Sequence, residues 1–160
     1  PRTLIIRPSP MASASGTKGG AISTEMLPIE AIDHVALTVS DPVRSIRWYQ
    51  DTFGFTEARM EGLAEGPPFI LRVVGNSYLN LFPADQGSVE PSPGHNTIAM
   101  RHLAFRIAFD AIDSVQARLE AKGHDVKSFQ YGPRCRSLFL GDPDGHQIEL
   151  IAYAEGVFVD

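Results

Sequence analysis

The sequence predicts an α+β fold built from two consecutive βαβββ modules. The stretch "IDHVALTV" at residues 32–39 is repeated, with variation, as "MRHLAFRI" at residues 100–107, and the repeat aligns His34 with His102. A helical stretch and three strand-like stretches follow each copy in the same order. Because there are two copies rather than a long array, we expect one pair of modules that share a core.

The two helical stretches show start signals, stop signals and an apolar stripe. The first begins with Asp41 as a suitable N-cap and Pro42 at the first helical position. The second is expected to open at Asp110, and Gly54 and Gly123 stand where C-caps would lie. Apolar residues recur at helical spacing in both stretches, at Ile46, Tyr49 and Phe53 and at Ile112, Val115 and Leu119.

Three further strands are predicted in each module, and the last two of the second module are joined by the turn "DPDG" at 142–145. The predicted strands cover 56–61, 69–74 and 77–83, then 125–131, 135–141 and 146–153. The globular domain is therefore expected over residues 29–160, with module one at 29–83, a linker at 84–98 and module two at 99–154.

Residues 1–28 differ from the rest of the chain. They are rich in Pro, Ser, Gly, Ala and Thr, and they show no hydrophobic period. The short apolar run "TLII" is too brief for the apolar core of a signal peptide. We expect an N-terminal extension that is flexible or partly a remnant of cloning, or an arm that packs on a partner subunit.

Composition indicates an ordinary globular protein and excludes several classes of partner. Hydrophobic residues make up 43%, charged residues 21%, and the formal net charge is −5. An acidic balance gives nucleic-acid phosphates no electrostatic attraction, so no nucleic-acid partner is expected. No apolar run approaches the ~20 residues of a membrane helix. The lone Cys135 excludes an internal disulfide and fits a cytoplasmic location.

The two-residue period of a strand separates the histidines from the apolar core. In the first strand His34, Ala36 and Thr38 share one face, and Val35 and Leu37 lie on the other. The larger apolar residues are expected beneath the helix. The histidine face is therefore expected to point away from the helix, towards the space that the two sheets enclose.

The same parity places further polar residues on this face. His102 and Arg106 share it in the first strand of module two, and Glu149 shares it in the last. Asn80 is the equivalent of Glu149 in module one, and Tyr78 lies on the same face of that strand. A carboxylate between branched apolar neighbours is costly to bury unless it has a partner.

Two histidines and a carboxylate on one face form a set that binds a divalent metal and leaves coordination positions open. We therefore expect His34, His102 and Glu149 to be metal ligands. The alternative is a structural pair of Glu149 with Arg106. The remaining histidines, His95, His124 and His146, are expected on the surface.

The stretches "IDHVALTVSDPVRSIRWYQDTFGF", "RHLAFRI" and "SLFLGDPDGHQIELI" resemble the vicinal oxygen chelate superfamily. This superfamily includes glyoxalase I, extradiol ring-cleavage dioxygenases, fosfomycin-modifying enzymes and bleomycin-binding proteins. The resemblance covers residues 30–154. It implies the glyoxalase fold, in which paired βαβββ modules form curved sheets around a metal-binding cup.

The resemblance also implies a site, a metal and an assembly. It assigns the ligands to His34, His102 and Glu149, and it puts Asn80 in the slot that a glutamate fills in glyoxalase I. A neutral amide is a poor ligand for a divalent cation, so three protein ligands are expected for one ion of Fe, Mn, Ni or Zn. A homodimer is implied, with modules paired within one chain or exchanged between two chains.

The activity implied is that of a metal-dependent enzyme that chelates a small substrate through vicinal oxygens, as a glyoxalase-like lyase or isomerase or as a dioxygenase. Phe139 stands where the ring-cleavage enzymes often carry a tyrosine, which favours the lyase or isomerase. Tyr131 is the candidate proton donor. Candidate substrate contacts are Arg106, Asn80, Thr38, Tyr78 and Phe139. The alternatives are a metal-free ligand-binding protein of the bleomycin-resistance type and a metal kept only for structure.

Overall fold

The computed structural model describes residues 28–85, 90–94 and 96–157. All of the expected extension except Pro28, together with His95, lies outside these residues. The chain from Ile32 onwards forms one compact unit. Within the described part of the chain, no helix has the length and apolar character needed to span a membrane.

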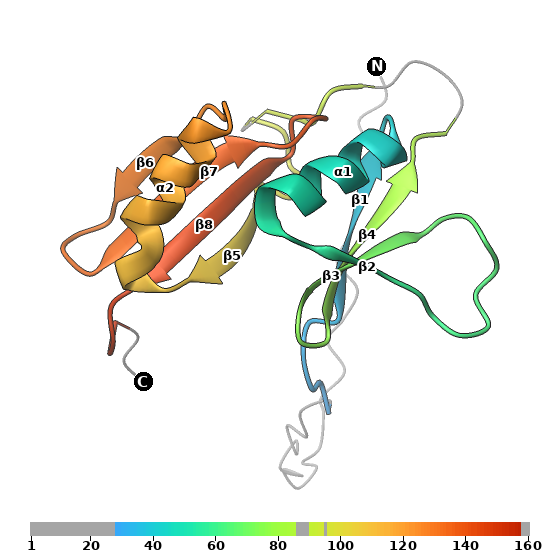
Figure 1. The fold of residues 1–160 in the computed structure, drawn as a ribbon, viewed down its shortest axis with the longest axis horizontal. Coiled ribbons are helices and arrows are strands. Elements are labelled where there is room, and N and C mark those ends of the chain that lie inside the picture. The colour runs from blue at the N-terminus through green and yellow to red at the C-terminus, as the bar shows by residue number, and fades with distance from the viewer. Residues whose placement is uncertain (1–27, 86–89, 95, 158–160) are drawn as a thin grey trace, which may run out of the picture. The chain divides into compact units, whose positions relative to one another are not determined.

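The predicted pair of βαβββ modules is confirmed (Figure 1). The first module consists of β1 (His34–Val39), α1 (Pro42–Phe53), β2 (Thr56–Ala58), β3 (Phe69–Val74) and β4 (Ser77–Pro83). The second consists of β5 (Leu103–Ile107), a 3₁₀ turn (Phe109–Ala111), α2 (Ile112–Ala121), β6 (Lys127–Gln130), β7 (Cys135–Gly141) and β8 (Gln147–Tyr153).

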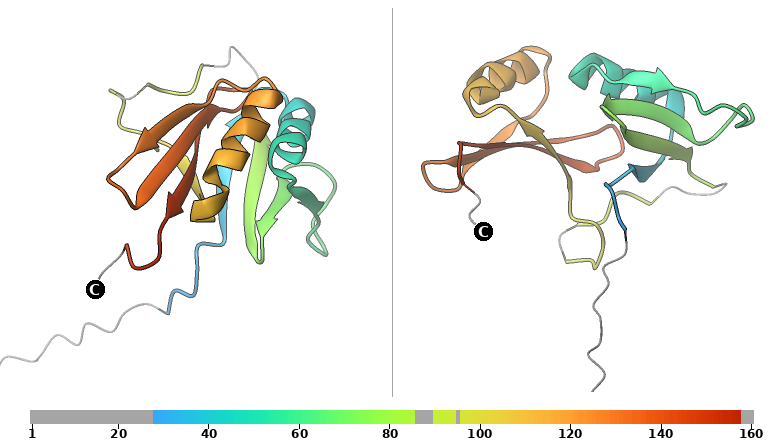
Figure 2. Two further views of the ribbon diagram at one scale, coloured as in Figure 1. Left: turned by 60° about the vertical axis from the view of Figure 1, so that its left-hand side comes forward. Right: turned by 90° about the horizontal axis from the view of Figure 1, so that it is seen from below.

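Each module forms its own four-stranded sheet, and the two sheets have equivalent strand orders. Sheet one is ordered β1-β4-β3-β2 and sheet two β5-β8-β7-β6. The first strand pairs in parallel with the last in both sheets, and all other pairs are antiparallel. The helix crosses from the first strand to the strand at the far edge of the sheet, and the chain then returns strand by strand until the last strand lies beside the first. Each helix covers one face of its own sheet (Figure 2). We call the opposite face of each sheet its open face.

The start of α1 follows the prediction, whereas the start of α2 does not. The carboxylate of Asp41 accepts a hydrogen bond from the Arg44 N–H at 3.1 Å, and Gly54 ends α1 with a φ of 76°. Asp110 is not an N-cap: it lies inside the 3₁₀ turn, and α2 begins after Ala111 with no side-chain cap. The preceding 3₁₀ turn shifts the start of the α-helix beyond the aspartate.

The core consists of the helix-facing positions of both sheets, as the two-residue period predicts. Leu37 pairs in register with Leu81, and both side chains are almost inaccessible to solvent. Leu138 and Leu150 form the equivalent buried pair in sheet two. This burial removes the large aliphatic side chains from water and leaves the open faces to polar and aromatic residues.

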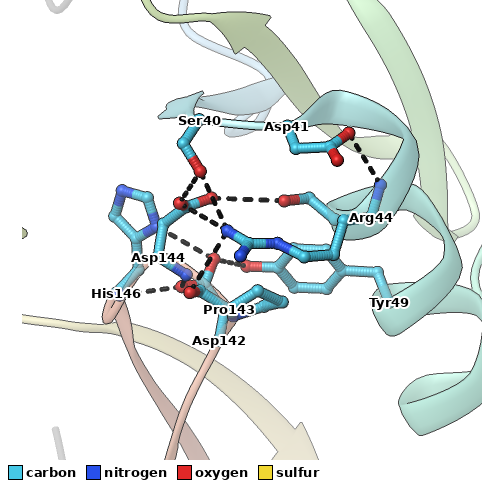
Figure 3. A network of polar contacts seen from close by, with 9 residues as sticks. Ser40, Asp41, Arg44, Tyr49, Asp142, Pro143, Asp144 and His146 are labelled. Carbon is cyan, nitrogen blue, oxygen red and sulfur yellow. Dashed lines mark hydrogen bonds and ion pairs between the residues drawn. The ribbon is translucent and has the colours of Figure 1, made fainter. Parts of the chain in front are cut away.

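The two modules are joined by a buried carboxylate, that of Asp142 in the turn between β7 and β8 (Figure 3). The Tyr49 hydroxyl of α1 donates to Asp142 Oδ2 at 3.0 Å. The backbone N–H groups of Asp144 and His146 donate to Asp142 Oδ1, and His146 Nδ1 lies 2.9 Å from Oδ2. These contacts make His146 a structural residue of the junction, so the prediction of a surface histidine is wrong.

A second carboxylate, that of Asp144, meets the N-terminal end of α1. Its Oδ1 lies 2.5 Å from the Ser40 hydroxyl and 2.8 Å from Arg44 Nη2, and Ser45 donates to its Oδ2. Burial raises the pKa of Asp144, but the hydrogen bonds from Ser40 and Ser45 and the charge of Arg44 outweigh it and hold that pKa below its ordinary value. The turn therefore docks on α1 through charge-assisted hydrogen bonds.

His124, which was expected on the surface, is partly buried. It lies at the end of α2, where its ring packs edge-on against Trp48, and its Nε2 lies 3.3 Å from the Thr52 hydroxyl. Phe53 and Phe55 add apolar contacts to Phe105 of β5. The helix α1 thus contacts module two along much of its length.

Replacing Tyr49 by phenylalanine is expected to destabilise the folded chain. The substitution keeps the aromatic ring and removes one donor from a buried carboxylate, a loss of about 1–3 kcal/mol. The free energy of unfolding from urea titration measures it. Tyr131→Phe, at an exposed tyrosine, is the matched control and should change little. A Tyr49→Phe protein as stable as the wild type would show that the Asp142 contact does not hold the junction.

The contribution of His146 to stability is expected to depend on pH. The hydrogen bond to Asp142 raises the pKa of His146 above the ordinary histidine value of 6.5, against the opposing effect of burial. The stabilisation is therefore complete below pH 6.5 and is lost as the pH rises through the higher pKa of the folded state.

His146→Gln should accordingly lower the free energy of unfolding more at about pH 6 than at about pH 8. His124→Gln is the contrasting variant, because burial and then the charge of Lys122 lower the pKa of His124, and its effect should have the opposite pH dependence. Equal losses at both pH values for His146→Gln would contradict the assignment.

Candidate functional site

His102 and Glu149 meet on the open face of sheet two. Glu149 lies near the start of β8, opposite Ala104 of β5 and Phe139 of β7, and 5% of it is exposed. His102 immediately precedes β5, and its Nε2 lies 2.9 Å from Glu149 Oε2. The His102 and Phe139 rings also pack edge to face, with ring centroids 5.5 Å apart.

The second oxygen of Glu149 has a partner that sequence reasoning missed. The Ser137 hydroxyl donates to Glu149 Oε1 at 2.5 Å, and Ser137 is completely buried. Ser137 lies in β7 two residues before Phe139, so strand parity places both on the open face. Strand parity could therefore have placed Ser137 on the open face before the structure was known. Its neighbours in the sequence do not indicate that its hydroxyl bonds to Glu149.

Cys135 and Tyr153 form a register pair farther along the same open face. Burial, and then the charge of Glu149, raise the pKa of the Cys135 thiol. The guanidinium of Arg106 lies 4.9 Å from the centre of the Tyr153 ring. A thiol with a raised pKa carries little thiolate near neutral pH, so this cysteine is poorly suited to act as a nucleophile.

His34 lies on the open face of sheet one. It is opposite Tyr78 in register, its side chain is 45% exposed, and its Nδ1 lies 2.6 Å from Asp33 Oδ1. Arg72 continues the same row, with its guanidinium 5.1 Å from the centre of the Tyr78 ring. His34, Arg72 and Tyr78 also line a cavity of about 230 Å³, together with Asn80 and Arg59 among others.

Asn80 lies in the neighbouring row, opposite Ala36 and Ile70. It is almost fully buried, and its Oδ1 has no hydrogen-bond partner among the described residues. A buried acceptor without a partner is unfavourable, so this amide is a candidate for contact with a bound molecule.

The other candidate residues lie apart from the His102–Glu149 pair. Thr38 is exposed on β1 and lines a different cavity, with Ser40 and Arg44 among others. Tyr131 follows β6 and is exposed. Arg136, which alternates with Ser137 along β7, lies on the helix side of sheet two, where it forms an ion pair with Asp113 of α2 at 2.6 Å.

The structure brings together two of the three expected metal ligands. Within residues 28–85, 90–94 and 96–157, no three His, Cys, Asp or Glu side chains gather in a way that would hold a metal ion. His102 and Glu149 are in contact, whereas the carboxylate in contact with His34 is that of Asp33.

The chain matches a family model and several curated proteins. The model of the Glyoxalase/Bleomycin resistance protein/Dioxygenase superfamily matches residues 31–150. The uncharacterized protein YaeR of Escherichia coli is 30% identical over 78% of this chain and 98% of its own length. A metallothiol transferase, FosB of Shouchella clausii, is 25% identical over 76% of this chain and 80% of its own length.

The fold is shared with solved structures. The lactoylglutathione lyase of Agrobacterium tumefaciens superposes with a TM-score of 0.62 at 23% identity, covering 82% of this chain and all of that one. At 23% identity, this similarity shows a shared fold and does not show a shared activity.

Proposed function

Because the chain belongs to the Glyoxalase/Bleomycin resistance protein/Dioxygenase superfamily, we propose that it is a metal-dependent enzyme that binds a small substrate through neighbouring oxygens. The observation that carries the proposal is the contact of His102 Nε2 with Glu149 Oε2 at 2.9 Å. A carboxylate so deeply buried needs donors or a cation, and an imidazole beside it supplies the second ligand type that divalent metals bind.

The spacing of these two atoms fits a shared metal ion. Ligand nitrogens and oxygens lie about 2.0–2.2 Å from such ions, so two ligands at a right angle are separated by roughly 3 Å. The observed 2.9 Å is the length of a direct contact between the two side chains and also matches that separation, so a metal could replace the contact without moving either residue far. Asn80, at the position of module one that corresponds to Glu149, offers only a neutral amide, which favours a site with three protein ligands and open positions.

We propose His34 as the third ligand, supplied by the other subunit of a homodimer. Support comes from its equivalence to His102 in the repeat and from its place on an open face, where its ring is partly exposed. A second subunit would also account for a chain in which His102 and Glu149 meet without a third ligand among the described residues. In a symmetric dimer, two equivalent sites would form.

The chain's own residues would bind and orient the substrate. Arg106 offers positive charge beside Tyr153 on sheet two, and Asn80, Thr38 and Tyr78 offer polar groups on sheet one. Phe139 packs against His102 and would offer an apolar surface to the substrate. Tyr131 is the candidate to move a proton at its exposed hydroxyl.

When bound, the metal would supply Lewis-acid stabilisation of charge that develops on the substrate oxygens, or dioxygen chemistry if it is iron. Phe139 has no hydroxyl to donate a hydrogen bond, which favours lyase or isomerase chemistry over ring cleavage. The identity of the ion, as Fe, Mn, Ni or Zn, is part of the same proposal. The single cysteine, Cys135, supports a cytoplasmic location.

An apolar cavity favours a second candidate, a metal-free ligand-binding protein of the bleomycin-resistance type. The cavity measures about 520 Å³, and its lining includes Phe53, Phe55, Val73 and Phe105. This size and lining suit a drug-sized apolar ligand. A metal-free binding protein does not require a buried carboxylate beside an imidazole, as Glu149 lies beside His102. We therefore prefer the metal-dependent enzyme.

Metal analysis tests the choice between the two functions. Wild-type protein purified without a histidine tag is expected to hold about one divalent ion per chain by plasma mass spectrometry. Glu149→Gln, which keeps the shape and removes the charge, should weaken metal binding by more than about 100-fold, since it removes a ligand rather than a supporting contact. Glu61→Gln, at an exposed glutamate, is the control. Wild-type protein that stays metal-free after reconstitution would favour the ligand-binding alternative.

Subunit mixing tests the origin of the third ligand. His34→Ala and Glu149→Ala proteins should each lack complete sites. If the site is shared between chains, unfolding and refolding them together in equal amounts should give one intact site in each mixed dimer, so about a quarter of all sites should regain metal. If each chain carries its own site, mixing should restore none.

A further inference from the structure

Ser137 occupies an unusual position for a serine. It lies in β7, a strand with neighbours on both sides, and it is completely buried. Its register partner in β8 is Ile151, but its hydroxyl reaches diagonally to Glu149 Oε1 at 2.5 Å. The backbone N–H and C=O groups of an internal strand are bonded to the neighbouring strands. The Ser137 hydroxyl therefore forms its hydrogen bond with the Glu149 carboxylate instead.

The two oxygens of Glu149 are therefore assigned to different partners. Oε1 accepts from Ser137, and Oε2 faces His102 Nε2. Without the serine, a carboxylate can rotate about its last torsion angle, which is broad for Glu. Either oxygen, or both together, would then be able to face the imidazole.

We propose that Ser137 is a positioning residue that holds Oε1 so that Glu149 presents a single oxygen, Oε2, beside His102. The proposal rests on the metal-dependent function above. A carboxylate that binds through one oxygen occupies one coordination position, whereas a bidentate carboxylate occupies two. Ser137 thereby keeps one more position open for the two neighbouring oxygens of the substrate.

The chain offers a matched control in Ser45 of α1. Ser45 is also completely buried, and its hydroxyl also donates to a carboxylate, that of Asp144, at 3.3 Å. Ser45→Ala therefore deletes the same atom from a comparable environment away from Glu149. Any effect that is general to the loss of a buried serine hydroxyl should appear in both variants.

The first experiment uses the metal-free protein. The ring nitrogens of His102 are followed by ¹⁵N NMR, with assignment from His102→Gln. Ser137→Ala should change the Nε2 signal, because the carboxylate beside it is no longer fixed, and Ser45→Ala should not. If Ser137→Ala does not fold, Ser137→Cys replaces the hydroxyl with a weaker donor of similar size.

The second experiment uses the metal-loaded protein. Ser137→Ala should weaken metal affinity by about 10- to 100-fold, as the loss of a hydrogen bond to a ligand typically does. Ser137→Thr, which retains a hydroxyl, should restore most of the affinity. The infrared spectrum of the carboxylate, isolated as the difference from Glu149→Gln, should show a narrower splitting of its two stretching bands in Ser137→Ala, as expected for a change from one bound oxygen to two.

The outcomes separate this inference from the proposed function. If wild-type protein binds metal and Ser137→Ala matches it in affinity and in carboxylate splitting, the positioning role is wrong and the metal site stands. If wild-type protein binds no metal, the proposed function fails and this role fails with it, even if the metal-free His102 signal changes as expected. If Ser45→Ala reproduces every effect of Ser137→Ala, the serine is structural.

Discussion

The buried carboxylate of Asp142 is the interaction on which the arrangement of the domain depends. It accepts a hydrogen bond from the Tyr49 hydroxyl of module one, and it contacts the backbone N–H and the ring nitrogen Nδ1 of His146 in module two. A carboxylate removed from water requires such donors, and no single module supplies all of them. The turn that carries it therefore gains its stability by docking on α1, and the two sheets are held together at the same point.

The pleat of the strands then separates packing from chemistry. Helix-facing positions carry leucine, isoleucine and valine and form the core. Open-face positions carry His34, His102, Ser137 and Glu149. Since successive side chains alternate, one strand contributes to both functions, and a register error of one residue would exchange them. The sheet pairing is thus as important to the site as the identity of its residues.

The repeat, the residues that share each face of a strand and the first helix could be predicted from the sequence, because these depend on local signals. Asp41 and Gly54 mark α1 through capping chemistry that needs only neighbouring residues. The prediction of Asp110 as the N-cap of α2 was wrong because a 3₁₀ turn comes before the α-helix. Residue preferences alone do not distinguish a 3₁₀ turn from the first turn of an α-helix.

Contacts between residues far apart in the sequence could not be predicted from these local signals. The position of His146 beside a turn indicates exposure, yet its ring is fixed by Asp142 in a junction between modules. His102 and Glu149 could be matched by parity and repeat position, whereas the bond from Ser137 to Glu149 crosses diagonally between strands. The two-residue period shows which side chains share the open face, but it does not show which of them are in contact. Those contacts depend on the twist of the sheet and on the side-chain rotamers.

The inequality of Asn80 and Glu149 has a consequence for how such a protein can change over time. Both occupy the same place in their modules. Asn80 is an uncharged amide whose oxygen has no partner among the residues that the structure describes, whereas Glu149 is an ionisable group with two partners. A duplicated module allows one copy to retain a demanding arrangement while the other accumulates substitutions. Under the proposed function, the Asn80 position of the first copy is free to diverge, whereas His34 of the same copy is retained as a ligand, so new ligand preferences can arise around Asn80 while the reactive set is preserved.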